Sequence, residues 1–177
     1  MNHADHVGLL RDGVAEPGGV WADLGSGTGA FTLALADLLG PGAQIYSVDR
    51  DRDALREQER AMRARFPAVG LQTIVGDFTR PLDLPPLDGI VMANALHFER
   101  KKDAVVRLLS GYLRPGGRLI LVEYNADHGN IWVPHPLSYA TWSALAERNG
   151  LAGTRLLAAV PSRFLGEIYS AVSYKAS

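Results

Sequence analysis

Short apolar segments alternate with helical segments along this chain, and this alternation restricts the fold more than any other feature. The predicted strands, each short and apolar, lie at residues 20–25, 44–49, 71–77, 89–94 and 118–124. The predicted helices, each with an apolar stripe, lie at residues 7–13, 30–39, 49–66 and 102–113. A β-α series needs crossover connections, so the strands run parallel in one sheet with helices on both faces.

The end of the chain has a different pattern. A helix capped by Ser138 runs to Asn149-Gly150, and two strands follow at residues 154–160 and 167–175. The segment PSRFLG between these strands is too short for a parallel crossover, so the last pair is antiparallel. We therefore predict an α/β fold with a doubly wound, seven-stranded, mostly parallel sheet and a C-terminal antiparallel hairpin.

Composition and charge restrict the function. With 177 residues the chain is most simply one domain, 1–177. Its net charge of −1 gives no field that attracts nucleic acid or an anionic membrane. Cysteine is absent, which excludes disulfides and thiolate chemistry and is compatible with a cytoplasmic protein. No apolar run approaches the length of a membrane span, and residues 1–13 are too polar for a secretory signal.

The segment GVWADLGSGTGAF (residues 19–31) joins the first strand to a helix through a glycine-rich turn. Residues 25–30 nearly fit the dinucleotide pattern G-x-G-x-x-G/A, and the strand-turn-helix context favours a ligand site. The glycines alone could simply supply positive φ angles. A nicotinamide dinucleotide would also use Asp49, about 20 residues further on, to bind ribose. Asp49 therefore does not identify the ligand.

Asp23 distinguishes the two kinds of ligand. A carboxylate close to the turn repels a pyrophosphate but attracts a cationic amino group. The backbone N–H groups of the turn suit a carboxylate. A ligand with an amino acid end and a ribose matches both features, and S-adenosylmethionine has both.

At these residues the chain resembles the class I S-adenosylmethionine-dependent methyltransferases, which have a Rossmann-like fold. The resemblance is strong over residues 18–124 and looser beyond. DLGSGTG is similar to the first motif of that family, YSVDRD to the acidic end of its second strand, and VGDF to its adenine contact. LDGIVMANALHF followed by LRPGGRLILVE resembles the small-molecule branch, of the methyltransferase domain 11/25 type, although Leu87 and Phe98 replace its usual residues.

The resemblance implies a division of the chain and a cofactor site. Residues 1–18 would form an N-terminal helix or cap segment, 19–124 the cofactor-binding core, and 125–177 an acceptor-side loop, helix and hairpin. Asp49 would hold the ribose hydroxyls, and Asp77 and Phe78 would contact adenine. The predicted contacts of S-adenosylmethionine, or of its product S-adenosylhomocysteine, are Asp23, Gly25, Ser26, Gly27, Thr28, Asp49, Arg50, Gly76, Asp77, Phe78, Asn94 and Ala95.

The expected reaction is methyl transfer by in-line displacement to an oxygen, nitrogen or sulfur atom of a small molecule. Alignment of the reactants supplies much of the rate, and a base is needed only where the acceptor must lose a proton. His97 is the candidate base because imidazole exchanges protons near neutral pH, but it could equally line the pocket or cap a helix. Tyr124 could hold an acceptor oxygen or pack against the following loop.

Four further residues are candidates for the acceptor pocket. His6 lies in the N-terminal segment, Trp132 and His135 in the long loop 125–136, and Arg163 in the hairpin loop. Each could instead anchor its own segment. His3, Asp5 and His6 could suggest a metal, but the acidic triads of catechol-type methyltransferases are not evident, and we predict no metal site.

Several alternatives stay open. The prolines that follow the fourth strand in amino-methylating nucleic-acid enzymes are missing, as is a cysteine nucleophile, which argues against nucleic-acid substrates. An aminopropyl transferase, a nicotinamide-dependent oxidoreductase and a non-catalytic S-adenosylmethionine-binding module are the competing functions. Because the chain is little more than the sheet and its helices, a homodimer could complete the acceptor site.

Overall fold

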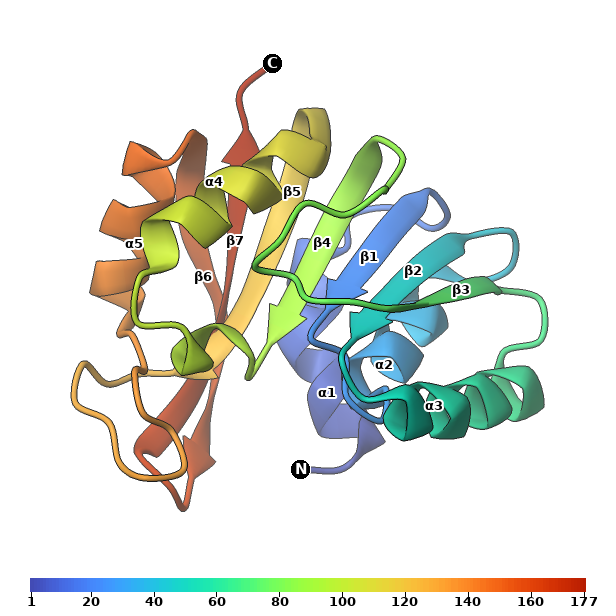
Figure 1. Cartoon of the computed structure of the whole chain (residues 1–177), viewed down its shortest axis with the longest axis horizontal. Helices are drawn as coiled ribbons and strands as arrows, with labels where there is room; N and C mark the ends of the chain where they lie inside the picture. The colour runs from blue at the N-terminus through green and yellow to red at the C-terminus, as the bar shows by residue number, and fades with distance from the viewer.

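The computed structural model describes all residues from 1 to 177. Seven strands form one sheet in the order β3-β2-β1-β4-β5-β7-β6 (Figure 1). The strands are β1 (Val20–Leu24), β2 (Gln44–Asp49), β3 (Gly70–Val75), β4 (Leu87–Ala93), β5 (Leu113–Tyr124), β6 (Leu151–Ser162) and β7 (Gly166–Lys175). The helices are α1 (His3–Leu10), α2 (Ala30–Leu39), α3 (Arg52–Arg65), α4 (Lys102–Tyr112) and α5 (Tyr139–Arg148), with short 3-10 helices η1 (Arg11–Gly13) and η2 (Leu96–Phe98).

The strand pairing confirms the predicted fold class. β1 pairs in parallel with β2 on one side and with β4 on the other, β2 and β4 pair in parallel with β3 and β5, and β7 is antiparallel to both β5 and β6. The chain therefore changes direction across the sheet between β1 and β4. Ligands of such sheets bind outside the carboxyl ends of the strands at this reversal.

Two apolar clusters hold the helices against the two faces of the sheet. Leu10 of α1, Leu35 of α2 and Met62 of α3 belong to the cluster on one face. Leu109 of α4 and Trp142 of α5 belong to the cluster on the other face. None of the helices is long and apolar enough to cross a membrane.

Several element boundaries differ from the sequence prediction. The first helix begins at His3 rather than at residue 7, because Asn2 and Asp5 form a reciprocal capping box. β5 begins at Leu113 rather than at residue 118 and has an irregularity in its first half, since Leu87 pairs with Leu113 but Gly89 with Arg118. β6 spans Leu151–Ser162 rather than 154–160, because β7 pairs along its whole length.

Asp23 of β1 is a buried carboxylate within this core. Only 1% of its surface is exposed, and its Oδ2 accepts a hydrogen bond of 2.7 Å from the Thr32 hydroxyl on α2. Burial raises the pKa of Asp23 to about 7, against the lowering effect of the Thr32 bond, and the nearby Asp49 adds to the rise. The carboxyl group thus tends to hold a proton near neutral pH.

Gly89 of β4 lies beneath the ring of Trp21, its partner on β1. A Cβ at this position would overlap the ring, so Gly89→Ala should lower the free energy of unfolding by about 1–3 kcal/mol in denaturant titrations. Gly111→Ala on the exposed side of α4 is the matched control, because nothing lies within 4 Å of its new Cβ. That variant should be neutral or slightly more stable, and equal losses in both would contradict the packing argument.

The raised pKa of Asp23 predicts a pH dependence of stability. In the unfolded chain an aspartate titrates near pH 3.9, so the proton held by folded Asp23 stabilises the fold at low pH and this contribution is lost as the pH rises from about 4 to about 7. Between pH 5 and pH 8, Asp23→Asn should gain about 1–3 kcal/mol of unfolding free energy relative to the natural chain. Denaturant titrations without cofactor measure this, and a pH-independent difference would contradict it.

Candidate active site

Two neighbouring cavities lie at the carboxyl ends of the central strands. The first, which we call the glycine-loop cavity, has a volume of about 340 Å³ and is lined by Gly25, Gly27, Asp49, Arg50, Gly76, Phe78, Asn94, Ala95, Phe98 and Glu99. The second, the histidine cavity, has a volume of about 570 Å³ and is lined by Asn94, His97, Tyr124, Trp132, Val133 and Phe164. Asn94 belongs to both, so the two cavities adjoin.

The glycine-rich turn after β1 is shaped by close approaches that exclude side chains. Gly25 has a φ of +76°, and a Cβ there would lie 2.6 Å from the Cβ of Ala95. Gly29 has a φ of +91°, and its Cβ would lie 2.6 Å from the Cγ of Gln58. The turn therefore presents bare backbone to the cavity, the arrangement that lets a ligand's polar end reach backbone N–H groups.

Side chains from β2 and α3 fix this turn. The Gly27 N–H donates to Asp49 Oδ2 at 2.7 Å. The buried Gln58 amide donates to Ser26 Oγ at 3.1 Å and to the Gly27 carbonyl at 3.2 Å. Ser26 Oγ also accepts from the Ser47 hydroxyl at 2.6 Å. The turn is thus held in one position against the end of β2, where Asp49 lines the cavity.

Arg50 and Asp77 form an ion pair beside the glycine-loop cavity. Arg50 Nη2 lies 2.7 Å from Asp77 Oδ2, and the Thr79 hydroxyl and N–H donate to the other oxygen at 2.7 and 2.9 Å. The hydrogen bond from the Arg50 guanidinium, together with those from Thr79, lowers the pKa of Asp77 to about 2. Asp77 is therefore ionised, and both of its oxygens already have partners.

Asn94 has an unusual conformation between the two cavities. It is the one residue other than glycine with a positive φ, 52°. Its Oδ1 is buried and has no hydrogen-bond partner. A strained backbone and an unsatisfied acceptor at one residue are typical of a position that contacts a ligand.

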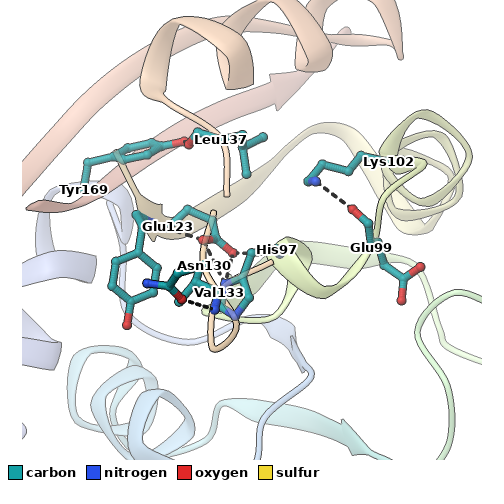
Figure 2. Close-up of polar contacts among 9 residues, drawn as sticks. His97, Glu99, Lys102, Glu123, Asn130, Val133, Leu137 and Tyr169 are labelled. Carbon is teal, nitrogen blue, oxygen red and sulfur yellow. Dashed lines mark hydrogen bonds and ion pairs between the residues drawn. The ribbon is translucent and has the colours of Figure 1, made fainter. Parts of the chain in front are cut away.

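His97, which lines the histidine cavity, is paired with the buried Glu123 behind it (Figure 2). His97 Nδ1 lies 3.0 Å from each carboxylate oxygen of Glu123 on β5. The backbone N–H groups of His97 and Tyr124 also donate to this carboxylate, at 3.1 and 3.0 Å. His97 is 3% exposed and Glu123 is fully buried. A carboxylate accepts hydrogen bonds, so the Nδ1 atom carries a proton, and in the neutral ring it is Nε2 that has the lone pair.

Tyr124 packs beside this pair. Its ring meets the edge of the His97 ring at 5.8 Å between centroids, and Phe164 of the hairpin loop lies edge-on to it at 6.4 Å. Burial raises the pKa of Tyr124, with a smaller contribution from the Glu123 charge, so its hydroxyl stays protonated at neutral pH. It is positioned as a hydrogen-bond donor at the cavity wall.

Most of the predicted cofactor contacts gather at the glycine-loop cavity. Those that line it are Gly25, Gly27, Asp49, Arg50, Gly76, Phe78, Asn94 and Ala95. Asp23, Ser26, Thr28 and Asp77 do not line it. The direct attraction between Asp23 and a ligand's amino group, on which the sequence argument depended, does not match this geometry, because Asp23 faces Thr32 in the core.

Half of the residues predicted for the acceptor side line the histidine cavity. His97, Tyr124 and Trp132 line the histidine cavity, whereas His6, His135 and Arg163 do not. His6 packs against Phe31 with ring centroids 4.7 Å apart, and the His135 N–H donates to the His97 carbonyl at 2.9 Å. In the hairpin loop Phe164 lines the cavity instead of Arg163.

Sequence reasoning also missed residues that the structure places at the site. Glu123 was not among the predicted site residues, and neither were Val133, Phe164, Phe98 and Glu99. An acidic residue in the otherwise apolar LILVEY segment was a usable signal, because a buried carboxylate needs a specific partner. No group of three or more histidine, aspartate or glutamate side chains is placed to hold a metal ion.

Comparisons with known proteins identify the family to which the chain belongs. A family described as a methyltransferase domain matches residues 16–154. The ubiquinone/menaquinone biosynthesis C-methyltransferase UbiE of Pasteurella multocida is 30% identical over 105 residues, which cover 58% of this chain and 39% of that protein. The reducing polyketide synthase grgA of a Penicillium species is 25% identical over 160 residues, 76% of this chain and 6% of that protein.

The chain therefore spans less than half the length of these curated relatives. Among solved structures, YcgJ from Bacillus subtilis has a TM-score of 0.76 at 16% identity and covers 99% of this chain and 100% of its own. The CurJ carbon methyltransferase has a TM-score of 0.74 at 20% identity and covers 92% of this chain and 50% of its own. At these identities the structures show the shared fold. The family match over most of the chain shows that this protein belongs to the methyltransferase-domain family, within the class I S-adenosylmethionine-dependent methyltransferases.

Proposed function

We propose that the chain methylates an acidic carbon of a small molecule, with His97 taking the proton of the acceptor and Glu123 orienting His97. The observation that carries this proposal is the buried His97–Glu123 pair in a cavity that adjoins the glycine-loop cavity through Asn94. Methyl transfer from S-adenosylmethionine is the activity of the family; the acceptor and the residue roles are our proposal.

The residues of the glycine-loop cavity fit S-adenosylmethionine. Gly25 and Gly27 would receive its amino acid end at bare backbone, and the Asp49 carboxylate would accept from the ribose hydroxyls. The unpaired Oδ1 of Asn94 would accept from a ligand N–H group where the cavities meet. When bound, S-adenosylmethionine supplies a methyl group activated by a sulfonium, and the histidine cavity holds the acceptor beside it.

The His97–Glu123 pair has the arrangement of a general base. Glu123 holds the Nδ1 proton, so the Nε2 lone pair of His97 is available to the acceptor. As Nε2 takes a proton, the ring becomes cationic, and the adjacent buried carboxylate stabilises that charge. The Tyr124 hydroxyl, which stays protonated, can donate to an oxygen of the acceptor.

An acidic carbon is the acceptor that most needs this base. Amines and thiols already hold a lone pair for attack, whereas a carbon between two carbonyl groups must first lose a proton. Two of the similar proteins are named as carbon methyltransferases, UbiE and CurJ. Carbon was not among the oxygen, nitrogen and sulfur acceptors that the sequence suggested.

The competing functions gain no support. The comparisons favour neither a nicotinamide-dependent oxidoreductase nor a non-catalytic module. Dimerisation, a cytoplasmic location and the exclusion of nucleic-acid substrates stay predictions of the sequence.

His97→Gln tests the base, because glutamine keeps the size and polarity of the side chain but cannot take a proton. With acetoacetyl-N-acetylcysteamine as the carbon acceptor, kcat should fall by about 10²- to 10⁴-fold, while the Kd for S-adenosylhomocysteine stays unchanged in calorimetry. Asp49→Ala serves as the control for the cofactor site, because this variant should bind S-adenosylhomocysteine more weakly. Equal turnover by His97→Gln and the natural chain would reject the role of His97.

Glu123→Gln tests the orientation of the histidine. The amide N–H would donate to Nδ1 and move the ring proton to Nε2, so the base would be lost although the shape is kept. We expect kcat for the carbon acceptor to fall by about 10²-fold or more, without a matching rise in KM. If Glu123→Gln keeps the kcat of the natural chain and the same dependence of kcat on pH, Glu123 serves the fold alone.

A further inference from the structure

A third cavity lies between the start of α4 and α5, on the other side of η2 from the histidine cavity. Its volume is about 600 Å³, and it is lined by Arg100, Lys101, Lys102, Asp103, Ala104, Arg107, Pro136, Leu137, Thr141, Leu145 and Arg148. Five of these residues are cations and one is an anion. The chain as a whole has a net charge of −1, so this concentration of positive charge is local.

Two of the cations are already used within the fold. Arg148 binds Asp103 through two hydrogen bonds, of 2.6 and 3.0 Å. Lys102 Nζ donates to the Glu99 carbonyl at 2.6 Å (Figure 2). These contacts neutralise the one acidic side chain of the cavity and hold the end of η2 against α4.

The other three cations, Arg100, Lys101 and Arg107, have no such partner. They are exposed and none of them forms an ion pair. Arg107 Nη2 donates to the Asn149 amide oxygen at 3.2 Å, which leaves the other N–H groups of its guanidinium free. Three unpaired cations around one cavity can converge on an anion.

Helix stability does not explain these cations. Lys101 is the N-cap of α4 and makes no side-chain cap hydrogen bond. The N-terminus of a helix carries partial positive charge, so Arg100 and Lys101 there are less favourable than acidic residues would be. Their placement breaks a local rule without a compensating contact in the fold, which is typical of a functional position.

No residue lines both the cationic cavity and the histidine cavity, but two short segments of the chain connect them. The chain passes from His97, which lines the histidine cavity, to Arg100, which lines the cationic one. A second segment passes likewise from Val133 to Leu137. The hydrogen bond of 2.9 Å from the His135 N–H to the His97 carbonyl joins the two segments. An elongated molecule that crosses this bridge would place one end in each cavity.

We propose that the cationic cavity binds a phosphate-type anion that the methyl acceptor carries, while its reacting carbon lies at His97. Phosphate suits this set because its oxygens accept from several cations at once and guanidinium groups bind it in a forked geometry. Leu137 and Leu145 provide an apolar floor for the part of the molecule next to the phosphate. The choice of the acceptor as the source of the phosphate rests on the proposed function.

The first experiment measures anion binding independently of catalysis. Inorganic pyrophosphate is titrated by calorimetry, at fixed ionic strength, into the full chain and into the variant Arg100→Ala/Lys101→Ala/Arg107→Ala. Binding should weaken about tenfold or more in this variant, as the loss of charge-assisted hydrogen bonds predicts. The matched control, Arg52→Ala/Arg60→Ala/Arg63→Ala, removes three exposed arginines of α3 and should bind as the natural chain does.

The second experiment identifies the source of the phosphate. The ratio of kcat/KM for acetoacetyl coenzyme A, which carries phosphates, to that for the phosphate-free acetoacetyl-N-acetylcysteamine is measured in all three proteins. The ratio should fall about tenfold in the variant that lacks Arg100, Lys101 and Arg107. It should stay constant in the α3 variant.

The outcomes separate the two proposals. The cationic site is overturned if the natural chain does not bind pyrophosphate. It is also overturned if the affinity for pyrophosphate falls equally in both variants. A third result is that pyrophosphate binding depends on Arg100, Lys101 and Arg107 while the ratio of kcat/KM for the two acceptors stays unchanged. That result overturns the acceptor as the source of the phosphate and assigns the site to a free anion. If neither thioester is methylated although S-adenosylhomocysteine and pyrophosphate both bind, the carbon acceptor of the proposed function is wrong and the anion site stands.

Discussion

The parallel pairing of β1 on both of its edges is the constraint on which the rest of this structure depends. Asp23, near the carboxyl end of β1, pairs with Ser47 of β2 on one side and with Val91 of β4 on the other. Because the connections after β1 and β4 go to helices on opposite faces, the loops at their carboxyl ends separate. Residues that follow β1 and β4 line the glycine-loop cavity, and residues that follow β4 help to line the histidine cavity, so the sheet order decides where both cavities lie.

The sequence predicted the features that depend on local rules. Strand and helix periodicity, and a hairpin loop too short for a crossover, are enough to give the sheet and its direction. The glycine-rich turn was also predictable, since its conformation is set by consecutive residues. The burial of Asp23 was not, because it depends on Thr32 of α2, which packs over the strand only after folding.

Long-range pairing decides the rest of the site. Glu123 meets His97, 26 residues earlier, because β4 and β5 are neighbours, and no local pattern records that contact. In the hairpin loop the site side chain is Phe164 and not Arg163, a one-residue difference that depends on how the turn is twisted. Glu123 accepts two backbone N–H groups as well as the imidazole, so a carboxylate without access to water keeps a full set of partners.

The position of Asn94 limits how this enzyme could acquire new acceptors. It lines both cavities, so under the proposed function a substitution there would alter cofactor binding and acceptor fit together. Trp132, Val133 and Phe164 border only the histidine cavity, and they come from a loop and a hairpin outside the central strands. Divergence of substrate range in related chains should therefore concentrate in these two segments, while the end of β4 changes slowly.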